Sequence, residues 1–339
     1  MPREPALAAS EARMAKRSRH GEGGGQDARS ERPAMGHGQP RPTSPDAAPP
    51  SPHRKSPMRT AILSTLITLV AAPLPAAEPA VATTRPDLAF PGETIDEWHG
   101  ARRHRFQFAG RSAWVVEPKE PLAGNPWSWC LMFPDAFTTR CAAPQLVAAG
   151  FHHAFLDVGN SFGSPDAVAK LAAFRDELVR RGLAPRAALI GISRGGLYAH
   201  RYASEHPEHV AVIYGDAGVC DFKSWPGGKG KGKGSPGDWK ACIAAYGFPD
   251  EAAALAYRGN PVDTLAPLAE AGVALVHVVG DADDVVPPAE NADIIERRYR
   301  ELGGTIELIR KPGCGHHPHG LDDPQPVVDF IIRHASAPQ

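Results

Sequence analysis

The chain has 339 residues, with 37 Lys and Arg against 38 Asp and Glu, so its formal net charge is −1. This balance argues against a polybasic nucleic-acid binder, and we expect no nucleic-acid partner. Five cysteines are too few for a disulfide scaffold, and they do not form paired CxxC zinc motifs.

Residues 1–57 lack the apolar side chains that a folded core needs. They contain no Phe, Trp, Tyr, Ile, Val or Cys, and a single Leu. Such a segment buries too little apolar surface to offset the entropy lost on ordering. We therefore predict a disordered or mis-annotated leader at residues 1–57, with translation starting at Met58. A basic interaction tail is the alternative.

The next segment has the pattern of a signal peptide. A short positive region, Met58-Arg59-Thr60, precedes the apolar run Ala61–Ala72, and small residues allow cleavage near Ala77 or after Ala82. The run is shorter than an ordinary transmembrane helix. We predict a signal peptide at residues 58–77, a secreted or periplasmic protein, and no stable membrane insertion after cleavage. An N-terminal membrane anchor is the alternative.

Export and cleavage would change both the charge and the redox environment of the chain. Residues 78–339 carry 26 basic and 32 acidic residues, a net charge of −6. An oxidising compartment would allow disulfide bridges, with at least one of the five cysteines left over. Their pairing stays open; the cysteines are Cys130, Cys141, Cys220, Cys242 and Cys314.

From residue 106 onward, strand-like and helix-like segments alternate. The predicted strands are Phe106–Phe108 and Ala113–Val116 as an antiparallel hairpin, then Trp127–Phe133, Phe151–Val158, Ala187–Gly191, Val210–Tyr214, Val273–Val279 and Thr305–Arg310. The predicted helices are Ala142–Ala149, Pro165–Arg181, Gly195–Glu205, Pro261–Ala271, Ala289–Leu302 and Pro324–His334. This alternation predicts one α/β domain at residues 83–339, with a mostly parallel central sheet and helices on both faces.

A candidate nucleophile lies where one of these strands gives way to a helix. The segment Gly191-Ile192-Ser193-Arg194-Gly195 matches G-x-S-x-G, and Gly196 follows it. A sharp strand-to-helix turn requires very small neighbours, which the glycines provide. The turn would place the Ser193 hydroxyl above a helix N-terminus, where backbone N–H groups stabilise an oxyanion. An ordinary glycine-rich turn is the alternative.

An acid and a base follow in the order that a serine nucleophile needs. The segment 280–287 (GDADDVVP) places carboxylates after a strand, and the segment 311–319 (KPGCGHHPH) places histidines after the last strand. Serine is a weak nucleophile until a base, oriented by an acid, removes its proton. The order Ser, Asp, His is that of α/β-hydrolases.

With these motifs the chain resembles the α/β-hydrolase superfamily over its whole mature length. The segment GISRGG is similar to the nucleophile elbow, and GDADDVVP to the acid loop. In that loop the acid stands three residues after the glycine, which implies Asp283. The histidine that follows a G-x-G turn is His316, so the implied triad is Ser193, Asp283 and His316. His317 and His319 are reserves for the base.

The sequence also suggests a second candidate acid, donors for an oxyanion and a group of histidines near the triad. Asp216, at the end of the preceding strand, is a rival acid or a residue that orders the following loop near the substrate. Oxyanion donors would be the backbone N–H groups of Arg194 and of Asp135 or Ala136. The three histidines at positions 316, 317 and 319 suggest metal binding, but no second cluster with ligand spacing accompanies them, so we expect no metal and no cofactor.

A lid or specificity insertion is expected after the strand Val210–Tyr214. It contains Trp225, Trp239 and the lysines Lys223, Lys229, Lys231 and Lys233. These lysines would either be solvated or, with the tryptophans as stacking platforms, bind an acidic or carbohydrate-rich substrate. Lys223, Trp225 and Asp216 are the candidate substrate-binding residues.

Together these features predict a secreted serine hydrolase that cleaves carboxylic esters through an acyl-enzyme. A small-molecule or polysaccharide ester is the expected substrate. A serine peptidase of the prolyl-oligopeptidase type is the nearest alternative, and a non-catalytic binding protein with the same fold is the second. Haloalkane or epoxide chemistry would normally require a carboxylate in place of Ser193.

Overall fold

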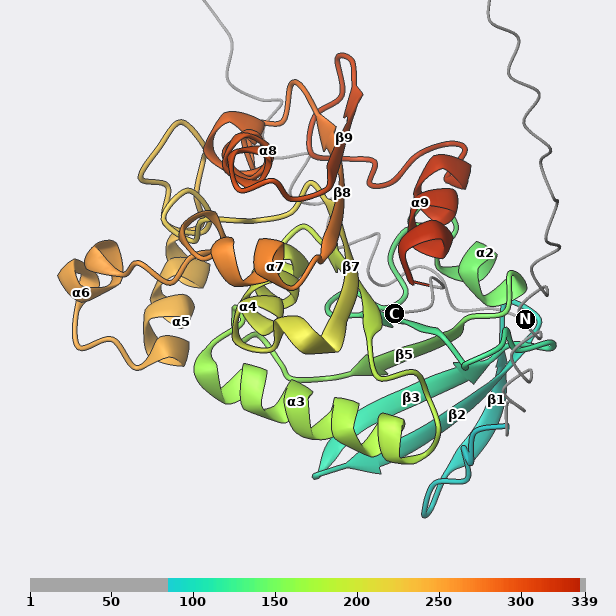
Figure 1. Cartoon of the computed structure of the whole chain (residues 1–339). Coiled ribbons are helices and arrows are strands. Elements are labelled where there is room, and N and C mark those ends of the chain that lie inside the picture. The colour runs from blue at the N-terminus through green and yellow to red at the C-terminus, as the bar shows by residue number, and fades with distance from the viewer. Residues whose placement is uncertain (1–84, 336–339) are drawn as a thin grey trace, which may run out of the picture. The chain divides into compact units, whose positions relative to one another are not determined.

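The computed structural model describes residues 85–335, so the predicted leader and signal peptide lie outside the described residues. A nine-stranded sheet organises this part of the chain, in the order β1-β2-β3-β5-β4-β6-β7-β8-β9 (Figure 1). The strands are β1 (Thr94–Trp98), β2 (Ala101–Phe108), β3 (Arg111–Glu117), β4 (Trp127–Cys130), β5 (His152–Leu156), β6 (Ala187–Ile192), β7 (Val210–Asp216), β8 (Ala274–Gly280) and β9 (Ile306–Lys311).

The sheet is parallel from β5 through β4 to β9 and antiparallel at its N-terminal edge. Strands β1, β2 and β3 pair antiparallel in sequence, and β3 pairs antiparallel with β5. The central strands β6, β7 and β8 are buried at every position, as expected for parallel strands covered on both faces. The α/β class and the antiparallel edge are therefore as predicted.

Two groups of helices cover the two faces of the sheet (Figure 1). The helices α2 (Ala143–Ala148) and α9 (Gln325–Ala335) pack on the face that Ile190 and Val212 line. The helices on the other face are α3 (Pro165–Arg180), α4 (Gly195–Glu205), α7 (Ala266–Glu270) and α8 (Ala292–Glu301). Because side chains alternate along a strand, Leu189 joins this second core while its neighbour Ile190 joins the first.

The chain between β7 and α7 forms the predicted insertion. It contains two helices that the sequence did not predict, α5 (Pro236–Tyr246) and α6 (Glu251–Ala256). The predicted helix Pro261–Ala271 is instead a short 3-10 turn, Pro261–Asp263, followed by α7. The buried ring of Phe222 lies 5.2 to 6.0 Å from the rings of Tyr246, Phe248 and Tyr257, so the insertion has its own aromatic core.

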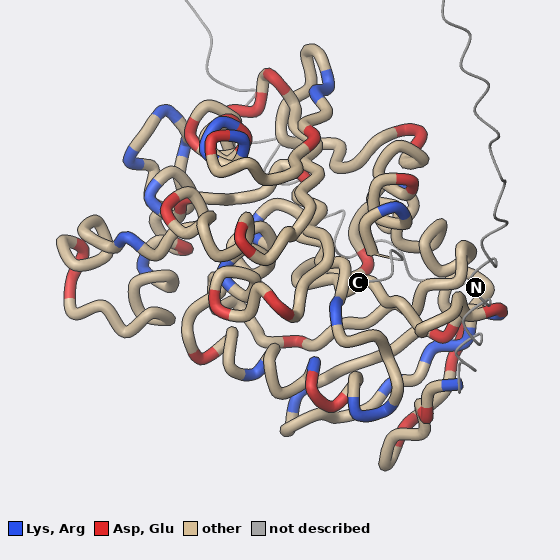
Figure 2. The backbone as a smooth tube through the Cα atoms, viewed as in Figure 1, with Lys and Arg blue, Asp and Glu red and all other residues tan. Residues whose placement is uncertain are grey.

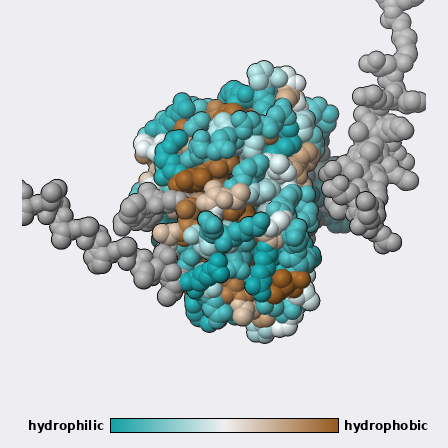
Figure 3. Space-filling model, turned by 90° about the vertical axis from the view of Figure 1, so that its right-hand side faces the viewer, coloured by the Kyte–Doolittle hydropathy of each residue, from teal (hydrophilic) through white to brown (hydrophobic). Residues whose placement is uncertain are grey.

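Large apolar side chains are exposed only at separate points of the described surface. Those exposed by more than a third are Ile95, Leu122, Leu255 and Leu302. On the face that Figure 3 shows, hydrophobic patches are small and surrounded by hydrophilic residues. Within residues 85–335, no helix is long and apolar enough to cross a membrane.

Candidate active site

Ser193 occupies a tight turn between β6 and α4. Its backbone has a φ of 49°, in the left-handed region that non-glycine residues seldom adopt. The turn closes only because its neighbours are glycines. A Cβ on Gly191 would lie 2.8 Å from the Gly195 oxygen, and one on Gly196 would lie 2.8 Å from the backbone of Val219. The strained serine and the small residues around it form the predicted elbow.

The structure brings Ser193, His316 and Asp283 into one hydrogen-bonded chain. Ser193 Oγ lies 2.9 Å from His316 Nε2, and His316 Nδ1 lies 2.8 Å from Asp283 Oδ2. A carboxylate only accepts hydrogen bonds, so Nδ1 carries the proton and Nε2 keeps the lone pair that accepts the serine hydroxyl. This is the tautomer in which a histidine removes the proton of a serine.

The loop after β8 fixes the second oxygen of Asp283. Its Oδ1 accepts the backbone N–H groups of Val285 and Val286, both at 2.9 Å. The Asp283 side chain is 1% exposed and that of His316 is 7% exposed. Three donors thus hold a buried carboxylate in a single orientation toward the imidazole.

Asp216 belongs to a different pair. Its Oδ1 accepts from His319 Nδ1 at 2.7 Å, while Oδ2 accepts the Tyr214 hydroxyl and the Gly320 N–H, both at 2.8 Å. Asp216 is fully buried. Although burial acts to raise its pKa, the hydrogen bond and charge of His319, followed by Lys311 and Tyr214, hold the pKa of Asp216 below its usual value.

These contacts correct both sequence-based roles of Asp216. It does not orient His316, whose Nδ1 faces Asp283, and it cannot touch a substrate because it has no exposed surface. Instead Asp216 anchors the loop that carries His316 to the end of β7 through His319 and Gly320. The alternative prediction was that Asp216 orders the loop that follows β7; the side chain instead holds the loop after β9.

Comparison with known proteins identifies the architecture around this site. No family model and no curated protein matches the chain. A puromycin-hydrolyzing peptidase from Mycobacterium tuberculosis is similar at a TM-score of 0.56 and 16% identity, over 71% of this chain and 40% of that one. The acylaminoacyl peptidase of Pyrococcus horikoshii is similar at 0.53 and 12%, over 73% and 42%. The chain has the α/β-hydrolase fold.

The chain spans about two fifths of the length of these two peptidases. Acetyl xylan esterase 1 from Thermoanaerobacterium sp. JW/SL YS485 is also similar, at a TM-score of 0.48 and 15% identity, over 72% of this chain and 88% of that one. At such low identities, the similarity to the two peptidases shows the fold alone.

In this α/β-hydrolase fold, the loops after β4 and β6 hold the candidate oxyanion donors. Within residues 85–335, no backbone carbonyl accepts the Arg194 N–H, which therefore remains available at the start of α4. The Ala136 N–H instead donates to the Phe133 carbonyl at 3.1 Å. Ala136 is thus a poor candidate because its donor is already used. Pro134 has no N–H, so Asp135 remains the candidate from this loop.

The lysines of the insertion do not form the positive cluster that their spacing suggests. Lys229 pairs with Glu251 and Lys233 with Asp284, both at 2.6 Å. Lys223 donates to the Tyr257 carbonyl at 3.2 Å and lies 3.9 Å from Asp221. Acidic and basic positions are interspersed along the chain in Figure 2. The contacts of Lys223 lie within the insertion and give no support to its predicted role in substrate binding.

The two tryptophans of the insertion have different surroundings. Trp239 is buried against Phe222 and donates its Nε1–H to Glu251 at 2.9 Å, so it cannot serve as a stacking platform. Trp225 is half-buried, and its ring lies 5.1 Å from the guanidinium carbon of Arg194, the residue after the nucleophile. Trp225 thus contacts the elbow through Arg194 and remains a candidate substrate-binding residue, whereas Asp216 contacts the elbow through its backbone carbonyl, which accepts the Ser193 N–H at 2.8 Å.

The Arg194 side chain links three loops around the nucleophile, a role that the sequence did not predict. Its guanidinium carbon lies 5.1 Å from the ring of Phe162 and 5.9 Å from that of Phe133, on the loops after β5 and β4. It also pairs with Asp238 at 3.5 Å in the insertion. Cation–π contacts and this ion pair together connect the insertion to the elbow.

All five cysteines are free thiols. Four are buried, and burial raises the pKa of Cys130 and Cys242 to about 12. The disulfide bridges that export would allow are absent from residues 85–335, which contain all five cysteines.

Proposed function

We propose that this protein is a serine hydrolase that cleaves carboxylic esters through an acyl-enzyme. The observation that carries this proposal is the chain of hydrogen bonds from Ser193 through His316 to Asp283, at the carboxyl ends of β6 and β8. A serine held at a left-handed φ beside an oriented, buried imidazole has the arrangement that nucleophilic acyl transfer requires.

In the first half-reaction, Ser193 Oγ attacks the carbonyl carbon of the substrate while His316 Nε2 takes the hydroxyl proton. Asp283 holds the imidazole in the required tautomer and stabilises the imidazolium that forms. The N–H groups of Arg194 and Asp135 are the proposed donors to the tetrahedral oxyanion. His316 then passes its proton to the leaving alcohol, and the acyl group remains on Ser193.

In the second half-reaction, water attacks the acyl-enzyme with His316 acting again as the general base. The acid product leaves and the serine hydroxyl is restored. Each step uses a side chain or backbone group of this chain together with water.

The second candidate function is a serine peptidase. It is favoured by the similarity in fold to two peptidases with TM-scores above 0.5. The same triad would then protonate a leaving amine in place of an alcohol. The proposal of secretion rests on the leader sequence. The proposal of a polysaccharide ester as the substrate rests on Trp225, whose ring lies beside the elbow as a candidate stacking surface for a sugar.

A fluorophosphonate probe, which reacts with activated serines, tests the nucleophile. We expect the parent protein to be labelled and Ser193→Ala to remain unlabelled. Ser204→Ala, which changes a serine that donates to the Arg201 carbonyl on α4, is the matched control and should be labelled like the parent. Equal labelling of parent and Ser193→Ala would exclude Ser193 and favour a non-catalytic binding protein.

A substrate panel then separates the two candidate activities. Acetyl, methyl and feruloyl esters should be hydrolysed by the parent, and aminoacyl amides tested beside them should not. Turnover of the amides in preference to the esters would replace the esterase proposal with the peptidase.

A further inference from the structure

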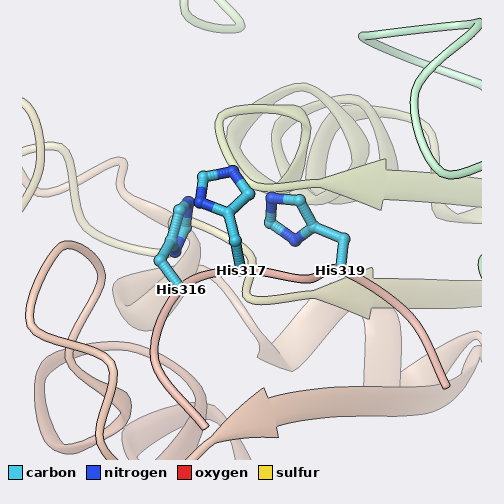
Figure 4. A group of neighbouring side chains, drawn as sticks. All are labelled: His316, His317 and His319. Carbon is cyan, nitrogen blue, oxygen red and sulfur yellow. The ribbon is translucent and has the colours of Figure 1, made fainter. Parts of the chain in front are cut away.

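Three histidine rings lie together beside the candidate nucleophile. The rings of His316, His317 and His319 have centroids 4.8 to 4.9 Å apart in every pairing. One nitrogen of each ring lies within 4.8 Å of the chosen nitrogens of the other two. Figure 4 shows the ring of His317 between those of His316 and His319 above the loop that carries all three.

Two of these rings are already oriented as metal ligands usually are. His316 Nδ1 faces Asp283 and His319 Nδ1 faces Asp216, at 2.8 and 2.7 Å. Each carboxylate holds a proton on Nδ1 and so makes Nε2 the nitrogen that offers a lone pair. A carboxylate behind a histidine is the common outer arrangement of zinc sites, where it fixes the ring and raises its basicity.

One nitrogen from each of the three rings lies within 4.8 Å of the other two, and a small dication would bind all three once the His317 side chain moved closer. Zinc binds histidine at about 2.0–2.1 Å, which places neighbouring ligand nitrogens about 3.3 Å apart in a tetrahedral site. The rings of His316 and His319 are buried, whereas His317 is exposed at the surface of the loop. Coordination of all three rings therefore requires the exposed His317 side chain to move toward an ion held by the other two.

The loop around the cluster is fixed and its charge is balanced. Arg140 Nε donates to the His319 carbonyl at 2.7 Å, and Lys311 Nζ donates to the carbonyls of Pro318 and Gly320 at 2.6 and 3.1 Å. Arg140 is also paired with Asp322, and the charge of Lys311 acts on the buried carboxylate of Asp216. Because carboxylates already hold the rings of His316 and His319, these two ligands lose little entropy when an ion binds.

We propose that the imidazoles of His316, His317 and His319 bind one Zn²⁺, and that this ion reversibly blocks the nucleophile. Imidazole nitrogens suit zinc, whereas Mg²⁺ prefers oxygen ligands. Zinc on His316 Nε2 occupies the lone pair that accepts the Ser193 proton, so the serine loses its base. The inhibitory part of this proposal rests on the proposed hydrolase function, and the metal site itself does not.

Binding is tested first, without reference to hydrolysis. Equilibrium dialysis with Zn²⁺, and the visible absorption of bound Co²⁺ displaced by Zn²⁺, should show one site per chain in the parent. His317→Ala should weaken zinc binding about tenfold or more, since loss of even an outer-shell partner typically costs 10–100-fold. Thermal unfolding verifies that this exposed substitution leaves the protein folded.

A second group of metal-binding residue types provides the matched control. His206, Glu208 and His209 also have ligand atoms within 4.8 Å of one another, but they are not backed by buried carboxylates. His206→Ala should therefore leave zinc binding unchanged. Zinc binding that survives His317→Ala, or is lost in His206→Ala, would overturn the proposed site, as would absence of zinc binding in the parent.

Inhibition is measured as the rate of fluorophosphonate labelling with and without Zn²⁺. The parent and His317→Ala are each compared with their own labelling rate in metal-free buffer. Zinc should slow the labelling of the parent. About a tenfold higher zinc concentration should be needed to slow the labelling of His317→Ala equally, and Mg²⁺ should slow neither protein. Zinc that binds through His317 without slowing a reactive parent would refute the inhibition. A parent unreactive even in metal-free buffer would refute the hydrolase function and leave the binding result standing.

Discussion

Two aspartate–histidine pairs lie side by side in this protein and have different roles. Both carboxylates are buried, and both face the Nδ1 atom of a histidine on the same loop. They differ in what the other ring nitrogen meets. His316 Nε2 faces Ser193, so the Asp283 pair can support chemistry, whereas the Asp216 pair fastens the loop to β7.

We predict that the two corresponding asparagine substitutions separate activity from stability. Asp283→Asn should lower kcat by roughly 10⁴-fold, the loss seen when the triad aspartate of a serine protease is replaced, because the imidazole adopts the wrong tautomer. Asp216→Asn should lower the free energy of unfolding by about 1–3 kcal/mol, because buried donors lose a charged acceptor, and should reduce kcat less than tenfold.

Steady-state hydrolysis of an ester substrate and thermal unfolding of both variants provide the check. The opposite pattern, with kcat lost in Asp216→Asn at unchanged Tm, would mean that Asp216 is the acid of the triad. The resemblance of the segment 280–287 to the acid loop of α/β-hydrolases implied Asp283 as the acid. The sequence could not reveal the Asp216–His319 pair, because that contact joins residues 103 positions apart and depends on where the loop folds.

At the scale of elements, a buried asparagine before α8 helps to join the insertion to the rest of the fold. Asn291 Oδ1 accepts the N–H groups of Cys220 and Asp221 at 2.8 and 3.1 Å, and its Nδ2 donates to Ser224 and to the Pro287 carbonyl. A single side chain thus satisfies backbone groups of the insertion at the point where it leaves β7.

We predict that Asn291→Ala lowers the free energy of unfolding by about 2–4 kcal/mol, because two N–H groups of the insertion lose their acceptor. Proteolysis should first cleave the insertion between residues 217 and 260. Asn291→Asp, which keeps the acceptor and loses the donors, is the matched variant and should be less destabilised. Equal stability of Asn291→Ala and the parent in urea would show that other contacts hold the insertion.

The elements predicted from sequence are those with strong local patterns. The apolar runs of β6, β7 and β8 and the helical period of α3 were located to within one or two residues. Strand β1 was missed because four of its five residues are exposed, which leaves no alternation to detect. Helices α5 and α6 were missed because they follow a run of glycine and lysine, and because the packing of Phe222 against Tyr246 and Tyr257 joins residues that lie far apart in the chain.

At the scale of the whole molecule, buried histidines make the fold sensitive to acid. His152 and His153 lie on β5, His277 lies on β8 and His200 on α4 beside it, and all are buried. Burial lowers the pKa of His152 and His200 to about 4 and that of His153 and His277 to about 3. Within the described residues, neither ring nitrogen of His277 has a hydrogen-bond partner.

The sign of the pH dependence follows from these lowered values. An unfolded histidine has a pKa near 6.5, so below that pH the unfolded chain binds protons that the folded protein does not. The free energy of unfolding should therefore be highest above pH 6.5 and fall as the pH drops toward 3. Each histidine contributes about 1 kcal/mol of loss between pH 7 and pH 5.5. Four such groups are comparable with the whole stability of a typical domain.

Urea unfolding at pH 7 and pH 5.5 measures this loss, and His277→Leu tests its origin. The leucine removes a titrating ring from a site that offers no hydrogen bond, so the variant should lose about 1 kcal/mol less than the parent over that interval. His206→Leu, at a half-exposed position, is the control and should follow the parent. A parent whose stability is the same at both pH values would contradict the prediction, because it would mean that the buried rings take up protons without unfolding.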